Sequence, residues 1–434
     1  MALPATANAS LATTPVPYMG WNPFYANEGY GSETTMEAVA SSLNSTGLLA
    51  AGYKIFWLDY GWWSNAASRD STTGELTVDP SQWPTGMSGF TAWLHSQGFL
   101  AGIYTDAGST GCNGGGVGSF GHYQQDANTF ANWGFDAVKM DFCGAGQVLE
   151  PEGYTPQQLY TEFSDALANN SSGRPMILNV CNFWTPGQVN GTLPTQQWSS
   201  GDNYQWAPSV SQSWRTDTDV GSFTGVAFKN VLRNLDQDST PNPGIQNAAG
   251  PPGGSFTPGP DPHGPPSRQI AWGHWNDPDY LTPGFLTSTQ AQSEFSMWAM
   301  VAAPLILGSD PRTLSSSMIS MLENAQVIAI DQDSLGAQGY LLSQSGSGQV
   351  WVKPLANGDL AVALFNRGSS ALQISTTITA VGLPQGNYQL TNLWTNTTTT
   401  TSNRISANVN PNAVVLYRVT APPASPVRRG RRKK

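Results

Sequence analysis

Residues 123–141, YQQDANTFANWGFDAVKMD, place a helical segment directly before a short apolar strand that ends on a carboxylate. Units of this kind recur from about Tyr18 to Arg312. The helical patterns include Thr34–Leu49, Gly86–Gln97, Tyr123–Trp133 and Pro156–Ala168. The expected strands are Tyr18–Trp21, Tyr53–Asp59, Phe99–Asp106, Ala137–Asp141, Met176–Cys181, Ser213–Thr216, Ile270–Trp275 and Pro304–Gly308. Alternating strands and helices imply a parallel sheet, and eight units in about 300 residues predict an α/β fold, the (β/α)8 TIM barrel.

A different pattern begins near Gly339. Short apolar segments follow one another without helical patterns between them, and turns such as Asn357-Gly358 separate them. The segments are VWVKPL, LAVALFN, ALQISTTI, YQLTNLW and VVLYRV. This pattern predicts a C-terminal antiparallel β-sandwich domain. The expected parts of the chain are an N-terminal extension (1–17), the barrel (18–338) with a Pro/Gly-rich insertion (239–268), the β-sandwich (339–420) and a basic disordered tail (421–434).

The composition excludes several classes of protein. The 434 residues include 19 Lys and Arg and 29 Asp and Glu, so the net charge is −10 while only 11% of residues are charged. An average soluble domain has about 25% charged residues. The 39% hydrophobic content and the 16 Trp, 14 Tyr and 16 Phe argue against disorder, and the scarcity of charge argues against a coiled coil. An acidic protein is also a poor partner for nucleic acid. The remaining composition is common among secreted carbohydrate-active proteins.

The termini and the potential metal ligands give further expectations. No run of 18 or more apolar residues predicts a membrane span. Residues 1–17 lack the features of a signal peptide, so we expect a secreted protein whose leader was removed or that uses another export route. Residues 427–434 hold six of the 19 basic groups, which predicts a solvated tail or, alternatively, weak contact with an anionic cell surface. The three cysteines and four histidines match no disulfide framework, zinc spacing or HExxH motif.

Several of the expected strands end on chemically active side chains. They finish as FWLD (Asp59), GIYTD (Asp106), VKMD (Asp141), NVC (Cys181) and SWRTDTD (Asp219). Helix capping explains one aspartate after a strand, but it is a poor explanation for four or five on successive strands. Because the carboxyl ends of barrel strands form the active face, this succession predicts an active site.

Cations and aromatic rings accompany these carboxylates. Lys139 and Asp141 are two apart on a strand and face the same side, so the cation should keep Asp141 ionised at neutral pH. Arg215 stands beside Asp217 and Asp219. Glycoside hydrolysis needs one charged and one protonated carboxyl, and flat apolar rings suit the faces of sugars. The rings near these strand ends are Trp21, Trp57, Trp62, Trp63, Phe183, Trp184 and Trp275.

Nine blocks of sequence run in order between residues 17 and 340. They are PYMGWNPF, GYKIFWLDYGWW, GIYTDAGSTGC, VKMDFCG, NVCNFW, WAPSVSQSWRTDTDV, WGHWNDPDYL, SEFSMWAMVAAPLILGSDPR and VIAIDQDSLGAQG. These blocks resemble glycoside hydrolase family 27, the α-galactosidase and α-N-acetylgalactosaminidase group. The resemblance implies a (β/α)8 barrel, a retaining mechanism, and neither a cofactor nor a metal. It puts Asp141 of VKMDFC at the nucleophile position and Asp219 of WRTDTDV at the acid/base position.

The resemblance also implies a sugar-binding subsite and a disulfide. The implied sugar contacts are Trp21, Asp59, Tyr60, Tyr104, Lys139, Cys181, Phe183, Arg215, Asp279 and Tyr280. Cys112 and Cys143 fall where family members carry a disulfide beside the site. Cys181 would then be an unpaired thiol that lines the pocket.

Two positions depart from the family pattern. The family usually has two adjacent acids where this chain has Asp59-Tyr60, and Met where it has Tyr280. Both border the sugar subsite, and a changed hydroxyl partner can change which sugar is accepted. We expect a retaining exo-α-galactosidase whose two carboxyls lie about 5–5.5 Å apart. The alternatives are an isomaltose-releasing dextranase, a β-L-arabinopyranosidase, or a non-catalytic carbohydrate-binding protein.

Overall fold

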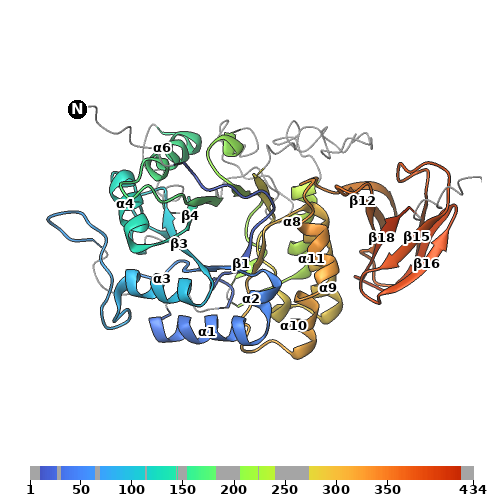
Figure 1. Ribbon diagram of the computed structural model, residues 1–434, viewed down its shortest axis with the longest axis horizontal. Helices are drawn as coiled ribbons and strands as arrows, with labels where there is room; N and C mark the ends of the chain where they lie inside the picture. Colours follow the sequence, from blue (N-terminus) through green and yellow to red (C-terminus); the bar gives the residue numbers. More distant parts are fainter. Residues whose placement is uncertain are drawn as a thin grey trace, which may run out of the picture.

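Eight parallel strands form the first domain of the computed structural model, which describes residues 10–26, 31–63, 69–112, 115–142, 144, 154–181, 206–222, 224–239 and 273–421. The strand order is β10-β1-β2-β3-β4-β5-β6-β9, and helices surround the strands (Figure 1). The bounds are β1 (Met19–Trp21), β2 (Ile55–Trp57), β3 (Leu100–Asp106), β4 (Ala137–Asp141), β5 (Ile177–Cys181), β6 (Ser213–Arg215), β9 (Trp275–Asp277) and β10 (Leu305–Leu307). The expected (β/α)8 class is confirmed. Nearly all of the predicted insertion and basic tail lie outside the described residues.

The barrel closes just after β9. Leu281 forms a parallel bridge to Leu307 on β10. The Leu281 N–H donates to the Ile306 carbonyl at 2.8 Å, and the Leu281 carbonyl accepts from the Gly308 N–H at 2.7 Å. Because Asp279 and Tyr280 directly precede this bridge, closure of the barrel fixes the backbone of two candidate site residues.

The seventh strand begins later than expected. The sequence predicts it at Ile270–Trp275, whereas β9 starts at Trp275. The ladder to β6 pairs Ser213 with Trp275 and Arg215 with Asp277, so pairing to the neighbouring strand sets the bounds. Residues 270–272 of the expected strand lie outside the described ranges, and residues 273 and 274 precede β9.

Helices cover the outside of the barrel. Their bounds are α1 (Glu33–Ser45), α2 (Leu48–Ala51), α3 (Gly86–Ser96), α4 (Tyr123–Trp133), α6 (Pro156–Ala168), α8 (Phe228–Ser239), α9 (Ser288–Val301), α10 (Ser316–Leu322) and α11 (Ala325–Asp331). The single helix expected at Thr34–Leu49 is wrong, because Gly47 has a left-handed φ of 88° and separates α1 from α2. In the described ranges, no helix combines the length and the apolarity needed to cross a membrane.

The C-terminal domain is the expected antiparallel sandwich. One sheet has the order β11-β12-β13-β18-β15-β16, and β14 pairs with β17 in the other. The bounds are β11 (Tyr340–Ser345), β12 (Gly348–Pro354), β13 (Leu360–Asn366), β14 (Leu372–Thr377), β15 (Tyr388–Asn392), β16 (Thr397–Thr401), β17 (Arg404–Val409) and β18 (Val414–Thr420). Buried side chains such as Val362, Leu364, Ile374 and Ile405 form its apolar core.

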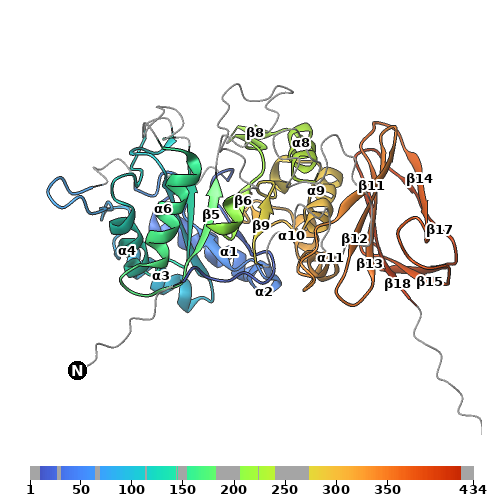
Figure 2. The same ribbon diagram turned by 90° about the horizontal axis from the view of Figure 1, so that it is seen from above.

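Helix α9 joins the two domains. It lies between the barrel strands and the sandwich, as both views show (Figure 1, Figure 2). The Ser293 hydroxyl donates to the Asn412 carbonyl at 2.7 Å, and Lys353 Nζ on β12 donates to the Ala299 carbonyl at 2.8 Å. These contacts tie α9 itself to the sandwich, and the loop that precedes α9 leads back to the active face.

Candidate active site

The carboxyl ends of β3, β4 and β5 lie level with one another. In the parallel ladder Asp106 pairs with Asp141, and Asp141 pairs with Cys181. Two residues earlier, Tyr104 pairs with Lys139. Because side chains two apart on a strand face the same side, these residues form two adjacent layers at the end of the barrel.

Lys139 is a buried cation at this end. Its Nζ donates to Asp59 Oδ2 at 2.8 Å, and only 7% and 1% of the two side chains are exposed. The same carboxylate oxygen accepts a hydrogen bond from Asn22 Nδ2 at 2.7 Å. Burial alone would lower the pKa of Lys139, but the attraction of Asp59 and other acidic groups outweighs it and raises the pKa well above its ordinary value. Lys139 therefore stays protonated.

Three aromatic rings surround the Lys139 ammonium. The ring centroids of Phe24, Tyr104 and Tyr280 lie 5.4, 5.6 and 5.5 Å from its Nζ, within cation–π range. Tyr60 packs edge-on against Tyr104, with centroids 6.0 Å apart. Of the two positions that depart from the family pattern, Tyr280 therefore lies beside this cation, and Tyr60 packs against one of the rings around it.

Asp141 ends β4 and is partly buried, unlike the four buried residues before it on the strand. Its Oδ1 accepts a hydrogen bond from the Phe142 N–H at 2.8 Å, and its Oδ2 lies 3.5 Å from Cys112 Sγ. Burial raises the pKa of Asp141 to about 6, although the Lys139 ammonium acts in the opposite direction. The expectation that Lys139 keeps this carboxylate ionised is thus only partly correct, because Lys139 pairs with Asp59 and burial outweighs its attraction. Asp141 is nevertheless mostly ionised at neutral pH.

Arg215 bridges two further carboxylates. Its Nη2 lies 3.0 Å from Asp219 Oδ1 and 3.0 Å from Asp279 Oδ2. Arg215 and Asp279 are buried, whereas 43% of the Asp219 side chain is exposed. Asp279 Oδ2 also accepts hydrogen bonds from Tyr25 Oη at 2.6 Å and the Val220 N–H at 2.8 Å. Burial raises the pKa of Asp279 to about 6 despite the Arg215 guanidinium.

Asp217 and Asp219 differ in their partners. Asp217 is buried and accepts a hydrogen bond from Arg233 Nε at 3.0 Å. Asp219 faces Arg215 instead, and its charge contributes to the raised pKa of Asp141. The structure therefore brings Asp219 into the same electrostatic site as Asp141, while Asp217 supports the loop.

The loop after β9 holds Asp279 in an unusual backbone conformation. Its φ of 94° lies where non-glycine residues are rare. Trp298 Nε1 on α9 donates to the Asp279 carbonyl at 2.7 Å. Glu294 on α9 accepts from the Thr282 N–H at 2.8 Å and from Thr282 Oγ1 at 2.7 Å. Since such strain persists only where surrounding contacts enforce it, α9 positions Asp279 and, through it, Arg215.

Glu294 leads to a prediction about stability and pH. Burial raises its pKa from 4.5 to about 8, so between these values the folded protein holds a proton that the unfolded chain releases. The free energy of unfolding should therefore fall as pH rises through this window. Glu294→Gln removes the titration and should flatten the fall in melting temperature measured from about pH 5 to about pH 8. Asp331, whose pKa burial also raises to about 8, remains and contributes in the same direction. An unchanged pH profile would contradict this role of Glu294.

Asp106, which also ends a strand, supports loops. Its Oδ1 accepts from the Gly108 N–H at 2.7 Å, and its Oδ2 accepts from the Gly144 N–H at 2.9 Å. Ligand atoms of Asp106, Cys112 and Asp141 lie within 4.8 Å of one another, which is close enough to consider a metal ion. Because Asp106 commits both oxygens to backbone amides, we assign it to the support of these two loops and propose no metal there.

The other predicted residues lie around this cluster or outside the described part. Cys181 is a buried free thiol whose Sγ lies 3.8 Å from Arg215 Nη1. Trp21 is fully buried, and its Nε1 donates to the Ser309 carbonyl at 3.0 Å, so its contact with a sugar stays a prediction. Three residues named in the sequence analysis lie outside the described ranges: Cys143, Phe183 and Trp184.

Four supporting residues were not identified from the sequence: Asn22, Tyr25, Glu294 and Trp298. Three of them lie inside quoted blocks, in PYMGWNPF and SEFSMW, and Tyr25 follows the first block directly. Membership of these blocks was the only sequence feature that pointed to these residues. The sequence does not say which polar side chains of a block face a carboxylate.

A (β/α)8 barrel with clustered carboxylates and buried cations at its active face defines a glycoside hydrolase. A family model described as Alpha galactosidase A matches residues 18–259 and 267–333. A second model, described as the alpha galactosidase C-terminal beta sandwich domain, matches residues 345–419. The chain belongs to the α-galactosidase family, glycoside hydrolase family 27.

Relatives and solved structures agree with this membership. Alpha-galactosidase 2 of Arabidopsis thaliana is 33% identical over 408 residues, which cover 93% of this chain and 89% of the relative. The alpha-galactosidase of Coffea arabica is 34% identical over 420 residues, which cover 95% of each. Alpha-galactosidase I from Mortierella vinacea superposes with a TM-score of 0.75 at 26% identity, covering 95% of this chain and 98% of that structure.

Proposed function

We propose that the chain is a retaining exo-glycosidase that removes terminal α-D-galactosyl residues from oligo- or polysaccharides. Asp141 attacks the anomeric carbon while Asp219 protonates the leaving oxygen, which gives a glycosyl ester on Asp141. Water activated by Asp219 then hydrolyses the ester. The observation that supports these roles is the difference in exposure, since Asp141 is partly buried near the Lys139 cation whereas Asp219 is exposed, with 43% of its side chain open to solvent. The leaving group and the water must both reach the acid/base residue from the open side.

Electrostatics explains how Asp219 can change roles. The negative charge of Asp219 raises the pKa of Asp141, so the two carboxylates repel each other. Conversion of Asp141 to an uncharged ester removes this repulsion. Asp219, which gives its proton to the leaving group in the first step, accepts a proton from the attacking water in the second.

The buried polar residues are proposed to hold the hydroxyl groups of the sugar. The proposed contacts are Asp59, Tyr60, Tyr104, Lys139, Cys181, Arg215, Asp279 and Tyr280, together with Trp21 and Phe183 from the sequence. Lys139 and Arg215 are fixed cations within this set. Support for a galactoside comes from the relatives and from an alpha-galactosidase of Saccharomyces cerevisiae, 25% identical, whose structure was solved with raffinose.

Two residues support an alternative sugar specificity. Tyr60 replaces a family carboxylate, and the Tyr280 ring lies 5.5 Å from Lys139 Nζ. The alternatives are therefore release of isomaltose from dextran and hydrolysis of β-L-arabinopyranosides.

A substrate panel tests the proposed specificity. The substrates are an aryl α-galactoside, melibiose, dextran and an aryl β-L-arabinopyranoside, and the products are analysed by chromatography. Galactose from melibiose supports it; isomaltose from dextran without galactose would replace it. Binding without turnover of any substrate would favour a non-catalytic protein.

The pH dependence of activity should reflect the buried carboxylates. Burial raises the pKa values of both Asp141 and Asp279 to about 6, and only ionised Asp141 can attack the anomeric carbon. We therefore expect kcat/KM to fall as pH drops below about 6, with an apparent pKa that belongs to the coupled carboxylates. Initial rates with an aryl α-galactoside from about pH 4 to about pH 8 measure this fall in kcat/KM on the acidic side of the pH profile. A constant kcat/KM down to the acid end would contradict it.

A disulfide between Cys112 and Cys143, in a secreted protein, is part of the proposal. Its support is that Cys181 is a free thiol whereas Cys112 is not. Thiol labelling of the unreduced, denatured protein should then modify only Cys181. Labelling of all three cysteines would contradict the disulfide.

A further inference from the structure

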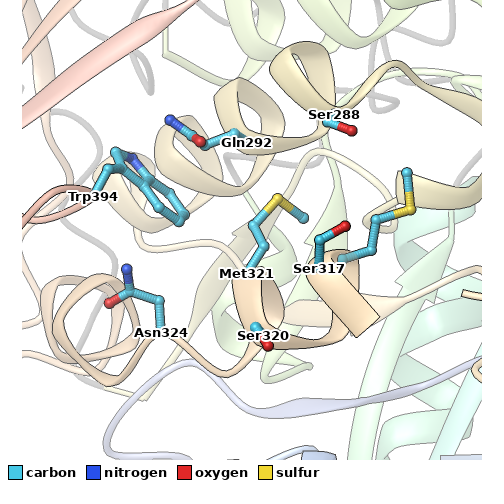
Figure 3. Close-up of a pocket in the computed structure, with 8 residues that line it drawn as sticks. Ser288, Gln292, Ser317, Ser320, Met321, Asn324 and Trp394 are labelled. Carbon is cyan, nitrogen blue, oxygen red and sulfur yellow. The ribbon is translucent and has the colours of Figure 1, made fainter. Parts of the chain in front are cut away.

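A pocket outside the active site lies where the barrel meets the sandwich (Figure 3). Its volume is about 300 Å³, at the lower end of the range of small-ligand pockets. Ser288 and Gln292 line it one turn apart on α9, and Ser317 and Met321 line it one turn apart on α10. Trp394, which follows β15, closes it from the sandwich side. The wall is thus formed by one face of each helix and an indole ring.

The indole ring of Trp394 is held in place. Its Nε1 donates to Ser296 Oγ at 3.0 Å, and its N–H donates to Asn392 Oδ1 at 2.9 Å. The ring packs edge-on against Phe295 on α9, with centroids 6.2 Å apart. In Figure 3, the Trp394 ring lies on the sandwich side of the pocket, and Met321 stands across from it. A fixed aromatic ring loses little conformational entropy when a ligand stacks on it.

The chemistry of the wall selects the kind of ligand. None of the residues that line the pocket is charged, so a charged ligand would find no counter-charge. The polar groups are hydroxyls, as in Ser288 and Ser317, and the amide of Gln292, while Trp394 and Met321 supply apolar surface. A pyranose ring combines neutral hydroxyl groups at its edge with apolar C–H groups on its face. It therefore matches both kinds of surface.

We propose that this pocket is a second carbohydrate-binding site, which takes one pyranose unit of a polysaccharide. Helices α9 and α10 follow β9 and β10, whose carboxyl ends lie on the active face. Ser288 lies in the first turn of α9, whereas Met321 and Asn324 lie at and beyond the end of α10, so the pocket extends along the whole of α10. Binding there raises the local concentration of polysaccharide near the catalytic carboxylates. The inference rests on the proposed function only in taking carbohydrate as the ligand, because binding requires no turnover.

Affinity electrophoresis of the full chain tests the site. The Asp141→Asn variant, which should not consume the probe, is run through gels that contain galactomannan, arabinogalactan or dextran. We expect at least one polysaccharide to retard it. Trp394→Ala in the same background should weaken the apparent affinity at least about tenfold, and Gln292→Ala, which leaves the ring in place, about threefold. Trp394→Phe should retain most of the affinity because it retains a ring.

A matched control removes a tryptophan elsewhere. Trp93→Ala deletes a partly buried indole on α3 that packs against Phe90, far along the chain from the pocket, and should leave retardation unchanged. Equal retardation of the parent and the Trp394→Ala variant, or no retardation in all three gels, would overturn the proposal. Failure of the wild-type enzyme to hydrolyse an aryl α-galactoside would contradict the proposed function and leave the gel result standing.

Discussion

The Asp141→Asn variant should lose at least about four orders of magnitude in kcat/KM for an aryl α-galactoside. The amide has the same shape as the carboxylate and can still accept the Phe142 N–H, which donates to Oδ1 at 2.8 Å. It cannot form the glycosyl ester, however, because it lacks the nucleophilic negative charge. Steady-state rates at neutral pH, where the carboxylate is mostly ionised, measure the loss. A variant with near-normal rates would refute the nucleophile assignment.

The same variant should be no less stable than the wild type. Burial raises the pKa of Asp141 from 3.8 to about 6. Above this pH the carboxylate is ionised in both states but is less well solvated in the folded protein, so it lowers the free energy of unfolding. Asparagine removes this cost, which amounts to roughly 1–3 kcal/mol of unfolding free energy. Thermal denaturation at neutral pH should show an equal or higher melting temperature. A large loss of stability would mean that the lost activity reflects misfolding, and the assignment would then need the azide experiment described below.

Local sequence patterns were sufficient for the architecture and the chemical class. Strands that end on aspartates, with Lys139 two residues before Asp141, predicted a barrel with a carboxylate site, and the observed ladder places Asp141 level with Asp106 and Cys181. This succeeds because the period of two on a strand fixes which side chains share a face. The active face of a parallel barrel then collects the ends of all its strands.

Partners across strands could not be predicted in the same way. The sequence placed Lys139 beside Asp141, but its Nζ pairs with Asp59, which follows β2, a strand two places away in the sheet, and that choice depends on three-dimensional packing. The same holds for Asp217 and Asp219, which are chemically identical in the RTDTD motif. The family resemblance chose Asp219 without a physical reason, and the tertiary partners, Arg233 for Asp217 and Arg215 for Asp219, supply the physical difference.

The Asp219→Ala variant should lose activity in a way that depends on the leaving group. General acid catalysis contributes about 10²–10⁴-fold, so hydrolysis of an unactivated disaccharide should fall by that factor. A dinitrophenyl α-galactoside, whose leaving group needs no proton, should form the glycosyl–Asp141 ester at a nearly normal rate. The ester then accumulates, because water lacks its base, and a pre-steady-state burst should appear. A loss of equal size for both substrates would contradict the acid role of Asp219.

Asp217→Asn is the matched control, since it removes the neighbouring carboxylate in the same loop. Asp217 pairs with Arg233 at 3.0 Å, so this variant should lose stability but should show no burst and no dependence on the leaving group.

Added azide distinguishes the nucleophile from the acid/base residue. In Asp219→Ala it should replace water in the second displacement and give α-galactosyl azide, because two inversions restore the configuration. In Asp141→Gly it should attack the substrate directly, and a single inversion gives β-galactosyl azide. NMR spectroscopy gives the anomeric configuration of each product. This configuration identifies the nucleophile and the acid/base residue even if a variant is less stable. The same anomer from both variants would refute the assignment.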